Sequence, residues 1–178
     1  RELWFNPMVL TKNIADMYLL TNGLPIDKDK SGLFKGYSTM TSEFDNRDPR
    51  MAMTFLVPGT LYFGEGSEWV VASAGFTGST STHTGYMLRK FRDETSDAAQ
   101  FRCEYDFKEF RYGEVLLILA EALYEKNGSI TDDELDKTIN LLRARVSMPS
   151  LTNAFVNSNG LNMQEEIRRE RTIELAFE

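Results

Sequence analysis

The chain has 178 residues, which is long enough for one domain with its own hydrophobic core. Its 27 acidic and 20 basic side chains give a net charge of −7. This excess of acid argues against nucleic-acid binding and against docking on anionic lipid, because both require a basic surface. Cys103 is the single cysteine, so the chain forms no internal disulfide and offers no cysteine pair for zinc.

No apolar stretch approaches the ~18 residues of a membrane-spanning helix, and the longest apolar run covers only residues 115–120. The chain opens at Arg1 without a leader peptide and stops at Glu178 inside a helical pattern. We therefore expect a fragment of a longer protein, whose targeting signals lie outside this sequence.

Residues 1–105 are rich in glycine, proline and other turn signals, so long irregular segments are predicted there. One helix is predicted over residues 11–20, where apolar side chains recur at helical spacing between a threonine cap and an Asn22-Gly23 stop. Residues 54–57 and 69–72 are predicted to be short strands.

Residues 106–178 are predicted to be mainly helical. Residues 111–126 are apolar nearly all round, which predicts a helix buried on most sides and ended by Asn127-Gly128. A second helix starts at the capping box of Thr131 and Glu134 and stops at Pro149. Its predicted buried stripe consists of Leu135, Ile139, Leu142 and Val146.

These two helices, joined by a few polar residues, are expected to form an antiparallel hairpin. A third helix is predicted from about Met163 to the end of the chain, with a highly charged outer face and a favourable pair between Glu165 and Arg169. Helix hairpins with alanine at packing positions suggest a stack of helical repeats, although the sequence shows no clean period of about 34 residues.

Three segments of this helical half resemble one known family. Residues 111–122, RYGEVLLILAEA, resemble the RYAEVLLxxAEA helix of the SusD/RagB family. Residues 139–149 resemble the end of its N-x-(I/L)-R-x-R-(A/V)-x-M-P helix, and residues 166–178 resemble its IxxERxxELAFEG helix.

Upstream segments agree with the same family. Residues 47–50 match an RDPR turn, residues 84–90 match a TGYxxRK segment, and residues 17–25 resemble an aY…nGxPI opening. The matches follow the family's order and spread over most of the chain. Together they identify the chain as similar to the SusD/RagB proteins of Gram-negative glycan-uptake systems.

The resemblance implies an all-α fold, in which a scaffold of helix hairpins of the tetratricopeptide type carries long irregular loops and a few short strands. It implies that residues 1–178 are the C-terminal portion of one domain, with a loop-rich ligand side over 1–105 and helical scaffold over 106–178. The lipidated cysteine and the first half of the scaffold would precede Arg1, and a GxRxxDLxRW segment would follow Glu178.

The resemblance also implies a function. Family members are lipid-anchored at the outer membrane, on the cell surface, where they cover a SusC-like TonB-dependent transporter. The expected function is therefore capture of an oligosaccharide or polysaccharide and its delivery to that transporter, with no catalytic residue, cofactor or metal. Contact with the membrane is expected only through an N-terminal lipid anchor outside this sequence.

Sugar rings stack on flat aromatic faces flanked by hydrogen-bonding groups, and residues 58–86 combine aromatic residues with serine, threonine and glycine. Family members often supply ligand-contacting aromatics from this region. We expect the ligand-binding residues to be Trp69 first, then Tyr62, with Phe63 and Phe76. The alternative for each is structural, with the ring fastening a long loop to the helices.

Two other patterns predict a structural role rather than a functional site. Residues 27–32, DKDKSG, look like the start of a calcium loop, but Ser38 stands where a bidentate acid is required, which predicts a solvated turn. In residues 47–50, Asp48 and Pro49 predict a turn rather than a functional charge cluster.

Glu114 and Glu121 are expected to pair with arginines of neighbouring helices, such as Arg143, Arg145 or those of the third helix, because buried charges need partners. His83 is the only histidine, and no nucleophile–base set can be built around it.

Two other classes of function remain open. One is a helical-repeat protein that binds peptide or protein cargo, which a long apolar or charged groove would favour. The other is a glycoside hydrolase, which needs two exposed carboxylates about 5 to 10 Å apart. If every candidate pair of carboxylates is buried against arginines, the glycoside-hydrolase hypothesis is removed.

Overall fold

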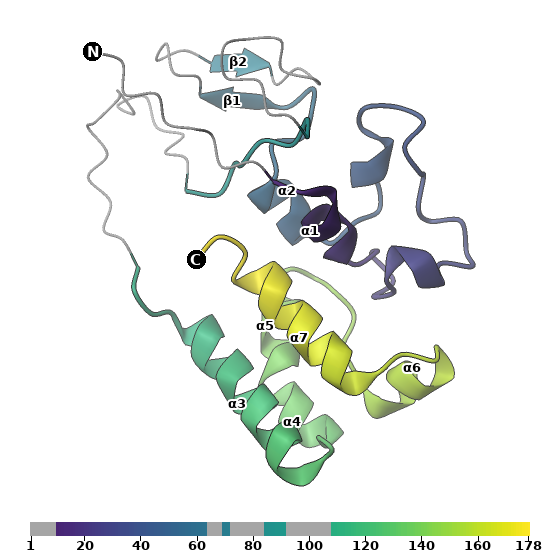
Figure 1. Cartoon of the computed structure of the whole chain (residues 1–178), viewed down its shortest axis with the longest axis vertical. Coiled ribbons are helices and arrows are strands. Elements are labelled where there is room, and N and C mark those ends of the chain that lie inside the picture. Colours follow the sequence, from purple (N-terminus) through teal and green to yellow (C-terminus); the bar gives the residue numbers. More distant parts are fainter. Residues whose placement is uncertain (1–9, 64–68, 72–83, 92–107) are drawn as a thin grey trace.

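The computed structural model describes residues 10–63, 69–71, 84–91 and 108–178. Within these ranges the regular secondary structure is helical apart from one two-stranded antiparallel sheet (Figure 1). This confirms the predicted all-α architecture with short strands. None of the described helices has the length and apolar character needed to cross a membrane.

Where the structure describes it, the first half contains two short α-helices and two single 3₁₀ turns. These are α1 (Lys12–Met17), η1 (Ile26–Lys28), η2 (Ser42–Phe44) and α2 (Pro49–Thr54). Helix α1 is shorter than predicted, because the backbone turns extended at Tyr18 and then pairs with the segment before α2. The Asp48 N–H donates to the Leu19 carbonyl at 2.8 Å, and Leu20 forms a β-bridge with Arg47.

The strand predicted over residues 54–57 is wrong. Thr54 is the last residue of α2, and only Phe55 forms an isolated bridge, to Leu88. Thr54 is helical because Asp48 caps α2 by accepting the Arg50 N–H at 2.9 Å, and because Pro49 favours helical geometry in the first turn. The strand predicted at 69–72 is confirmed as β2 (Trp69–Val71), which pairs with the unpredicted β1 (Leu61–Phe63).

The second half contains five helices in its described residues. These are α3 (Tyr112–Asn127), α4 (Asp132–Asp136), α5 (Ile139–Arg145), α6 (Asn153–Ser158) and α7 (Met163–Glu174). Gly128 ends α3 in the left-handed conformation at φ 69°, and the Thr131–Glu134 capping box starts α4, both as predicted. Helix α6 was not predicted.

The predicted second helix is broken into α4 and α5. Thr138 leaves helical geometry at the break, and its hydroxyl donates to the Glu134 carbonyl at 2.6 Å. Helix α5 ends at Arg145, four residues before Pro149. The predicted stripe is nevertheless confirmed, because Leu135, Ile139, Leu142 and Val146 are all buried.

Helix α3 is not buried on most sides, contrary to the prediction. Leu116, Leu117 and Ala120 are buried, but the opposite face is open, with Val115 53%, Ile118 48% and Leu119 45% exposed. Helices α5 and α7 contact α3 from one side. No other described element makes extensive contact with α3, so its apolar composition exceeds what these neighbours can cover.

Helix α7 lies between the two halves of the molecule (Figure 1) and contacts α3, α1 and α2. One core cluster packs Ile167 of α7 against Leu117, Ile139 and other residues of the second half. The other packs Ile173 of α7 against α1 and α2, including Tyr18 and Phe55. The loop-rich half is thereby built onto the helical half through one helix.

The predicted outward charged face of α7 holds for Glu165, which is exposed, but is wrong for its other three glutamates. Glu166, Glu170 and Glu174 are 2%, 0% and 3% exposed, because their spacing of four residues places them on the face that meets α2 and α5. Arg169 also pairs with Glu166, at 3.2 Å, in place of the predicted Glu165.

Candidate functional site

Three of the four predicted ligand-binding residues lie in one hairpin. Tyr62 and Phe63 belong to β1, and Trp69 belongs to β2. Phe63 and Trp69 are Cα partners across the antiparallel ladder, and Tyr62 is the partner of Val70. Phe76 lies outside the described residues. The backbone therefore brings these three aromatic residues to a single short hairpin.

The segment 84–91 connects this loop region to η2 and to the residues that follow α2. The Leu56 N–H donates to the Met87 carbonyl at 2.9 Å, and the Tyr86 hydroxyl donates to Glu43 at 2.7 Å. The Tyr86 ring also packs edge-on against Phe55, with centroids 5.5 Å apart. Partial burial and the hydrogen bond to Glu43 raise the pKa of the Tyr86 phenol. Tyr86 thus has the structural role that was the alternative for the loop aromatics.

The turn over residues 47–50 also has the predicted structural role. The Arg47 guanidinium donates to the carbonyls of Ala15, Tyr18 and Glu43 at 2.6 to 2.9 Å. It therefore holds the end of α1 and the 3₁₀ turn η2 together from inside.

A network of buried ion pairs connects this turn to the helices. The Arg50 guanidinium pairs with Asp48 at 2.7 Å and with Glu170 of α7 at 2.6 Å. The second Glu170 oxygen accepts from Arg143 of α5 at 2.9 Å. These four side chains are almost entirely buried, so each charge has an opposite charge in direct contact, as burial requires.

Glu174, one turn further along α7, is shared by three arginines. Its Oε1 accepts from Arg111 at 2.7 Å and from Arg145 at 2.8 Å, and its Oε2 accepts from Arg50 at 2.9 Å. Burial alone opposes ionisation of Glu174, but the hydrogen bonds and charges of these arginines outweigh it, so the pKa of Glu174 lies below its ordinary value. Glu174 is therefore ionised at neutral pH.

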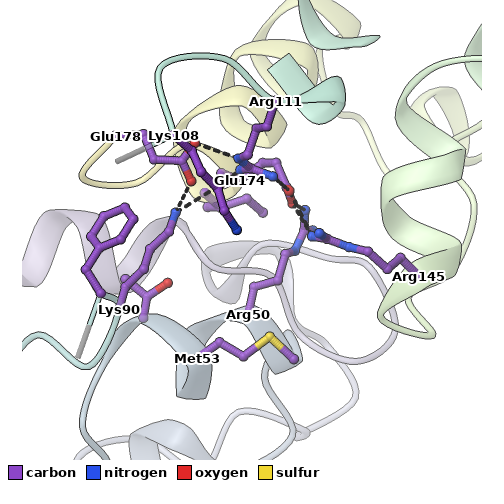
Figure 2. Close-up of a pocket in the computed structure, with 11 residues that line it drawn as sticks. Arg50, Met53, Lys90, Lys108, Arg111, Arg145, Glu174 and Glu178 are labelled. Atoms are coloured by element: carbon purple, nitrogen blue, oxygen red, sulfur yellow. Dashed lines mark hydrogen bonds and ion pairs between the residues drawn. The ribbon is translucent and has the colours of Figure 1, made fainter. Parts of the chain in front are cut away.

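Beside Glu174 the network opens into a cavity of ≈ 260 Å³ (Figure 2). Glu178 forms one side of it, paired with Lys90 at 2.6 Å and with Arg111 at 2.6 Å. The complete lining consists of Arg50, Met53, Thr54, Lys90, Phe91, Lys108, Arg111, Arg145, Ile173, Glu174 and Glu178. Five of these side chains are cationic and two are carboxylates.

The sequence did not predict this cavity, although all of its charged residues except Lys108 fall in family-like segments. Lys108 and Arg111 are three residues apart, but Arg50, Lys90 and Arg145 come from segments far from them along the chain. The available signal was that each family-like segment except residues 17–25 carries an arginine or lysine. Sequence spacing could not show that they converge on the end of α7.

Glu114 and Glu121 of α3 face Arg171 of α7, at 3.8 and 4.0 Å. This agrees with the prediction that arginines of neighbouring helices are their partners, and it selects the third helix over Arg143 and Arg145. Those two arginines pair with Glu170 and Glu174.

The calcium-like loop forms a polar turn, as predicted. The Asp29 carboxylate accepts the backbone N–H groups of Ser31 and Phe34, both at 2.8 Å, and the Ser31 hydroxyl at 2.6 Å. Over the part of the chain that the structure describes, no three metal-ligating side chains come together. His83 and Cys103 lie outside that part.

The model of the SusD family matches residues 5–178. This chain belongs to the SusD family. Among solved structures, this SusD-family chain is similar to a SusD-like carbohydrate-binding protein from Bacteroides fragilis, with 27% identity and a TM-score of 0.66. The match covers 93% of this chain and 32% of that protein.

A second SusD-like protein from Bacteroides fragilis is 24% identical with a TM-score of 0.67, a likeness that shows the fold alone. The match covers 95% of this chain and 33% of that protein. The SusD-family chain described here therefore spans about a third of the length of these relatives. A comparison with curated proteins finds no match.

Proposed function

We propose that this SusD-family chain is the C-terminal portion of a cell-surface receptor that captures a glycan and delivers it to a SusC-like TonB-dependent transporter. The observation that carries the proposal is the family match over residues 5–178, together with the likeness to a solved relative described as carbohydrate-binding. In this proposal a lipid anchor outside the sequence holds the receptor at the outer membrane.

The proposed ligand contacts come from the β1–β2 hairpin. Trp69 and Phe63 are directly opposed in its ladder, and Tyr62 is adjacent to Phe63. Aromatic rings stack against the apolar faces of sugars, so a hairpin that concentrates three of them is a suitable recognition element. Phe76 is retained as a fourth contact. Residues 1–105 then serve as the ligand side, and 106–178 as the scaffold.

The proposed receptor binds its glycan and does not cleave it. Both oxygens of Glu170 and both oxygens of Glu174 are engaged by arginines. A carboxylate held in this way cannot act as the acid or base of a glycoside hydrolase, which needs a free proton-transfer oxygen facing the substrate. This supports binding over hydrolysis for these buried carboxylates.

The test is a glycan-panel binding assay on the full-length protein, with Trp69→Ala and a matched control. Phe110→Ala is the control, because Phe110 is the most exposed large apolar side chain of the described residues and lies outside the hairpin. We expect binding to one polysaccharide class, with a loss of about tenfold or more in Trp69→Ala, given ~1.5–3 kcal/mol for burying a large apolar side chain. The Phe110→Ala variant should bind like the wild type.

Two results would redirect the proposal. Unchanged binding in a folded Trp69→Ala variant would move the site away from the hairpin. Absence of binding to every glycan, combined with binding to a peptide library, would favour the alternative of a helical-repeat protein with peptide or protein cargo.

A further inference from the structure

The ion-pair network is balanced at its buried end. Asp48, Arg50, Arg143 and Glu170 contribute two positive and two negative charges, and their side chains are almost inaccessible. These charges cancel, so the buried end of the network has no net charge to offer a ligand.

The open end of the network is not balanced. Lys90, Lys108, Arg111 and Arg145 line the cavity together with only two carboxylates, Glu174 and Glu178 (Figure 2). The described residues of the cavity wall thus carry an excess of two positive charges beyond the balanced set. This concentration is notable in a chain whose net charge is −7.

The two carboxylates are already saturated. Glu174 accepts from three arginines, and Glu178 accepts from Lys90 and Arg111 at 2.6 Å each. The arginine and lysine partners lower the pKa of both carboxylates below the ordinary value even though burial opposes it. Both carboxylates therefore stay ionised at neutral pH. The excess of two positive charges already counts each of them as a full negative charge.

Lys108 and Arg145 have N–H donors that make no hydrogen bond or ion pair with the described residues. Figure 2 shows Lys108 directed into the cavity, and it has no ion-pair partner among the described side chains. Arg145 uses only Nη2 in its bonds to described residues, at 2.8 and 3.0 Å to Glu174, and its side chain is 53% exposed. Its remaining N–H groups are therefore open to a ligand.

We propose that this cavity binds one oxyanion group, a carboxylate or a sulfate, carried by an acidic sugar of the captured glycan. The assignment rests on the proposed glycan-receptor function and names a class of substrate for it. An arginine fork matches the two oxygens of a carboxylate or sulfate, and a lysine adds a mobile point charge.

The size and the remaining wall fit one sugar residue. The cavity of ≈ 260 Å³ lies just below the roughly 300–1,000 Å³ of small-molecule pockets. Exposed Met53 and Phe91 line the same space, so an apolar face lies beside the cations. A sugar ring could rest on that face while its acidic group meets Lys108 and Arg145.

The experiment uses the full-length protein and isothermal titration calorimetry. The probes are a hexuronate oligosaccharide, its carboxyl-reduced neutral counterpart, and inorganic sulfate. The variants are Lys108→Gln and Arg145→Gln. Their controls, Lys126→Gln and Arg168→Gln, remove the same charges from exposed positions outside the cavity. Thermal unfolding of each variant verifies that it is folded.

We expect Lys108→Gln and Arg145→Gln each to weaken binding of the acidic oligosaccharide about tenfold, the size of a lost charge-assisted hydrogen bond. Both controls should bind like the wild type. The neutral counterpart should bind the wild type more weakly and should not respond to any of the four substitutions.

Three outcomes would overturn the proposal. Equal wild-type affinity for the acidic and the reduced oligosaccharide would remove the acidic-sugar assignment while leaving the glycan receptor intact. Equal losses in the cavity variants and the controls would show a general charge effect. Sulfate binding that depends on Lys108 and Arg145, without binding of any glycan, would refute the sugar source and the proposed receptor function together.

Discussion

Arg50 of α2 and Glu170 of α7, 120 residues apart in sequence, form a buried ion pair with 2.6 Å between Nη1 and Oε1. Asp48 and Arg143 bind the remaining faces of these two groups. Removing water from two charges costs free energy that their attraction roughly offsets, so such a pair mainly enforces one arrangement. Here it specifies how α2 sits on α7.

Glu170→Gln should strongly destabilise the protein. The substitution leaves Arg50 and Arg143 without a shared counter-charge in a buried site, and breaking buried pairs costs roughly 3–5 kcal/mol. The free energy of unfolding from urea titration measures the loss. Glu165→Gln, on the exposed side of the same helix, is the matched control and should change stability by less than about 0.5 kcal/mol. Similar losses in both variants would contradict the role assigned to Glu170.

Glu174 should make the protein acid-sensitive. Its folded-state pKa is depressed below the ordinary 4.5, so its stabilisation is present above that pH and is lost as pH falls through the folded value. Urea titrations below pH 4.5 should show a smaller decline for Glu174→Gln than for the wild type. Parallel curves for the two proteins would argue against this contribution.

Glu166 should act in the opposite direction. Burial, only partly offset by Arg169, raises its pKa, so its contribution is complete below pH 4.5 and is lost as pH rises through the folded value. The unfolding free energy of Glu166→Gln relative to the wild type should therefore increase between pH 4.5 and neutral pH. A relative stability that is flat or falls over this range would refute the assignment.

Neighbouring leucines of α3 should respond very differently to truncation. Leu117 is 0% exposed and Leu119 is 45% exposed. In a protein comprising residues 1–178, Leu117→Ala should cost about 2–5 kcal/mol of unfolding free energy, because it leaves a cavity in the core. Leu119→Ala should cost less than about 1 kcal/mol. A large cost for Leu119 would mean that its face is covered.

The capping box at α4 should be measurable in the same way. The Thr131 hydroxyl accepts the Glu134 N–H at 3.2 Å, and Glu134 accepts the Thr131 N–H at 2.8 Å. Thr131→Ala should cost about 1 kcal/mol in chemical denaturation. Thr11 also precedes a helix but makes no side-chain capping bond, so Thr11→Ala is the control and should be nearly neutral. Equal effects of the two substitutions would contradict a capping contribution.

Local signals in the sequence predicted local structure well. The left-handed Gly128 and the capping box of Thr131 and Glu134 were recognised because each depends on only a few adjacent residues. The stripe from Leu135 to Val146 was found for the same reason, although Thr138 interrupts the helix that carries it. The family followed from motifs that can be read along the chain.

The site was predicted less completely. The hairpin residues Tyr62, Phe63 and Trp69 were named from composition, and their role in binding stays a prediction. The strand expected over residues 54–57 was wrong, because the helix capped by Asp48 and begun by Pro49 runs through Thr54. The cavity could not be predicted, since Lys90, Lys108 and Arg145 meet only in three dimensions.

By itself, the sequence determined both ends of α3, the starts of α4 and α7, which family the chain belongs to, and that its net charge is acidic. Only the tertiary structure decided which faces of α3 and α7 are buried. It left half of α3 exposed, buried the α7 glutamates against arginines from α2 and α5, and gathered unbalanced cations at the open end of that network. The physical reason is range: caps and turns act over a few residues, whereas burial and charge pairing depend on elements that pack across the whole chain.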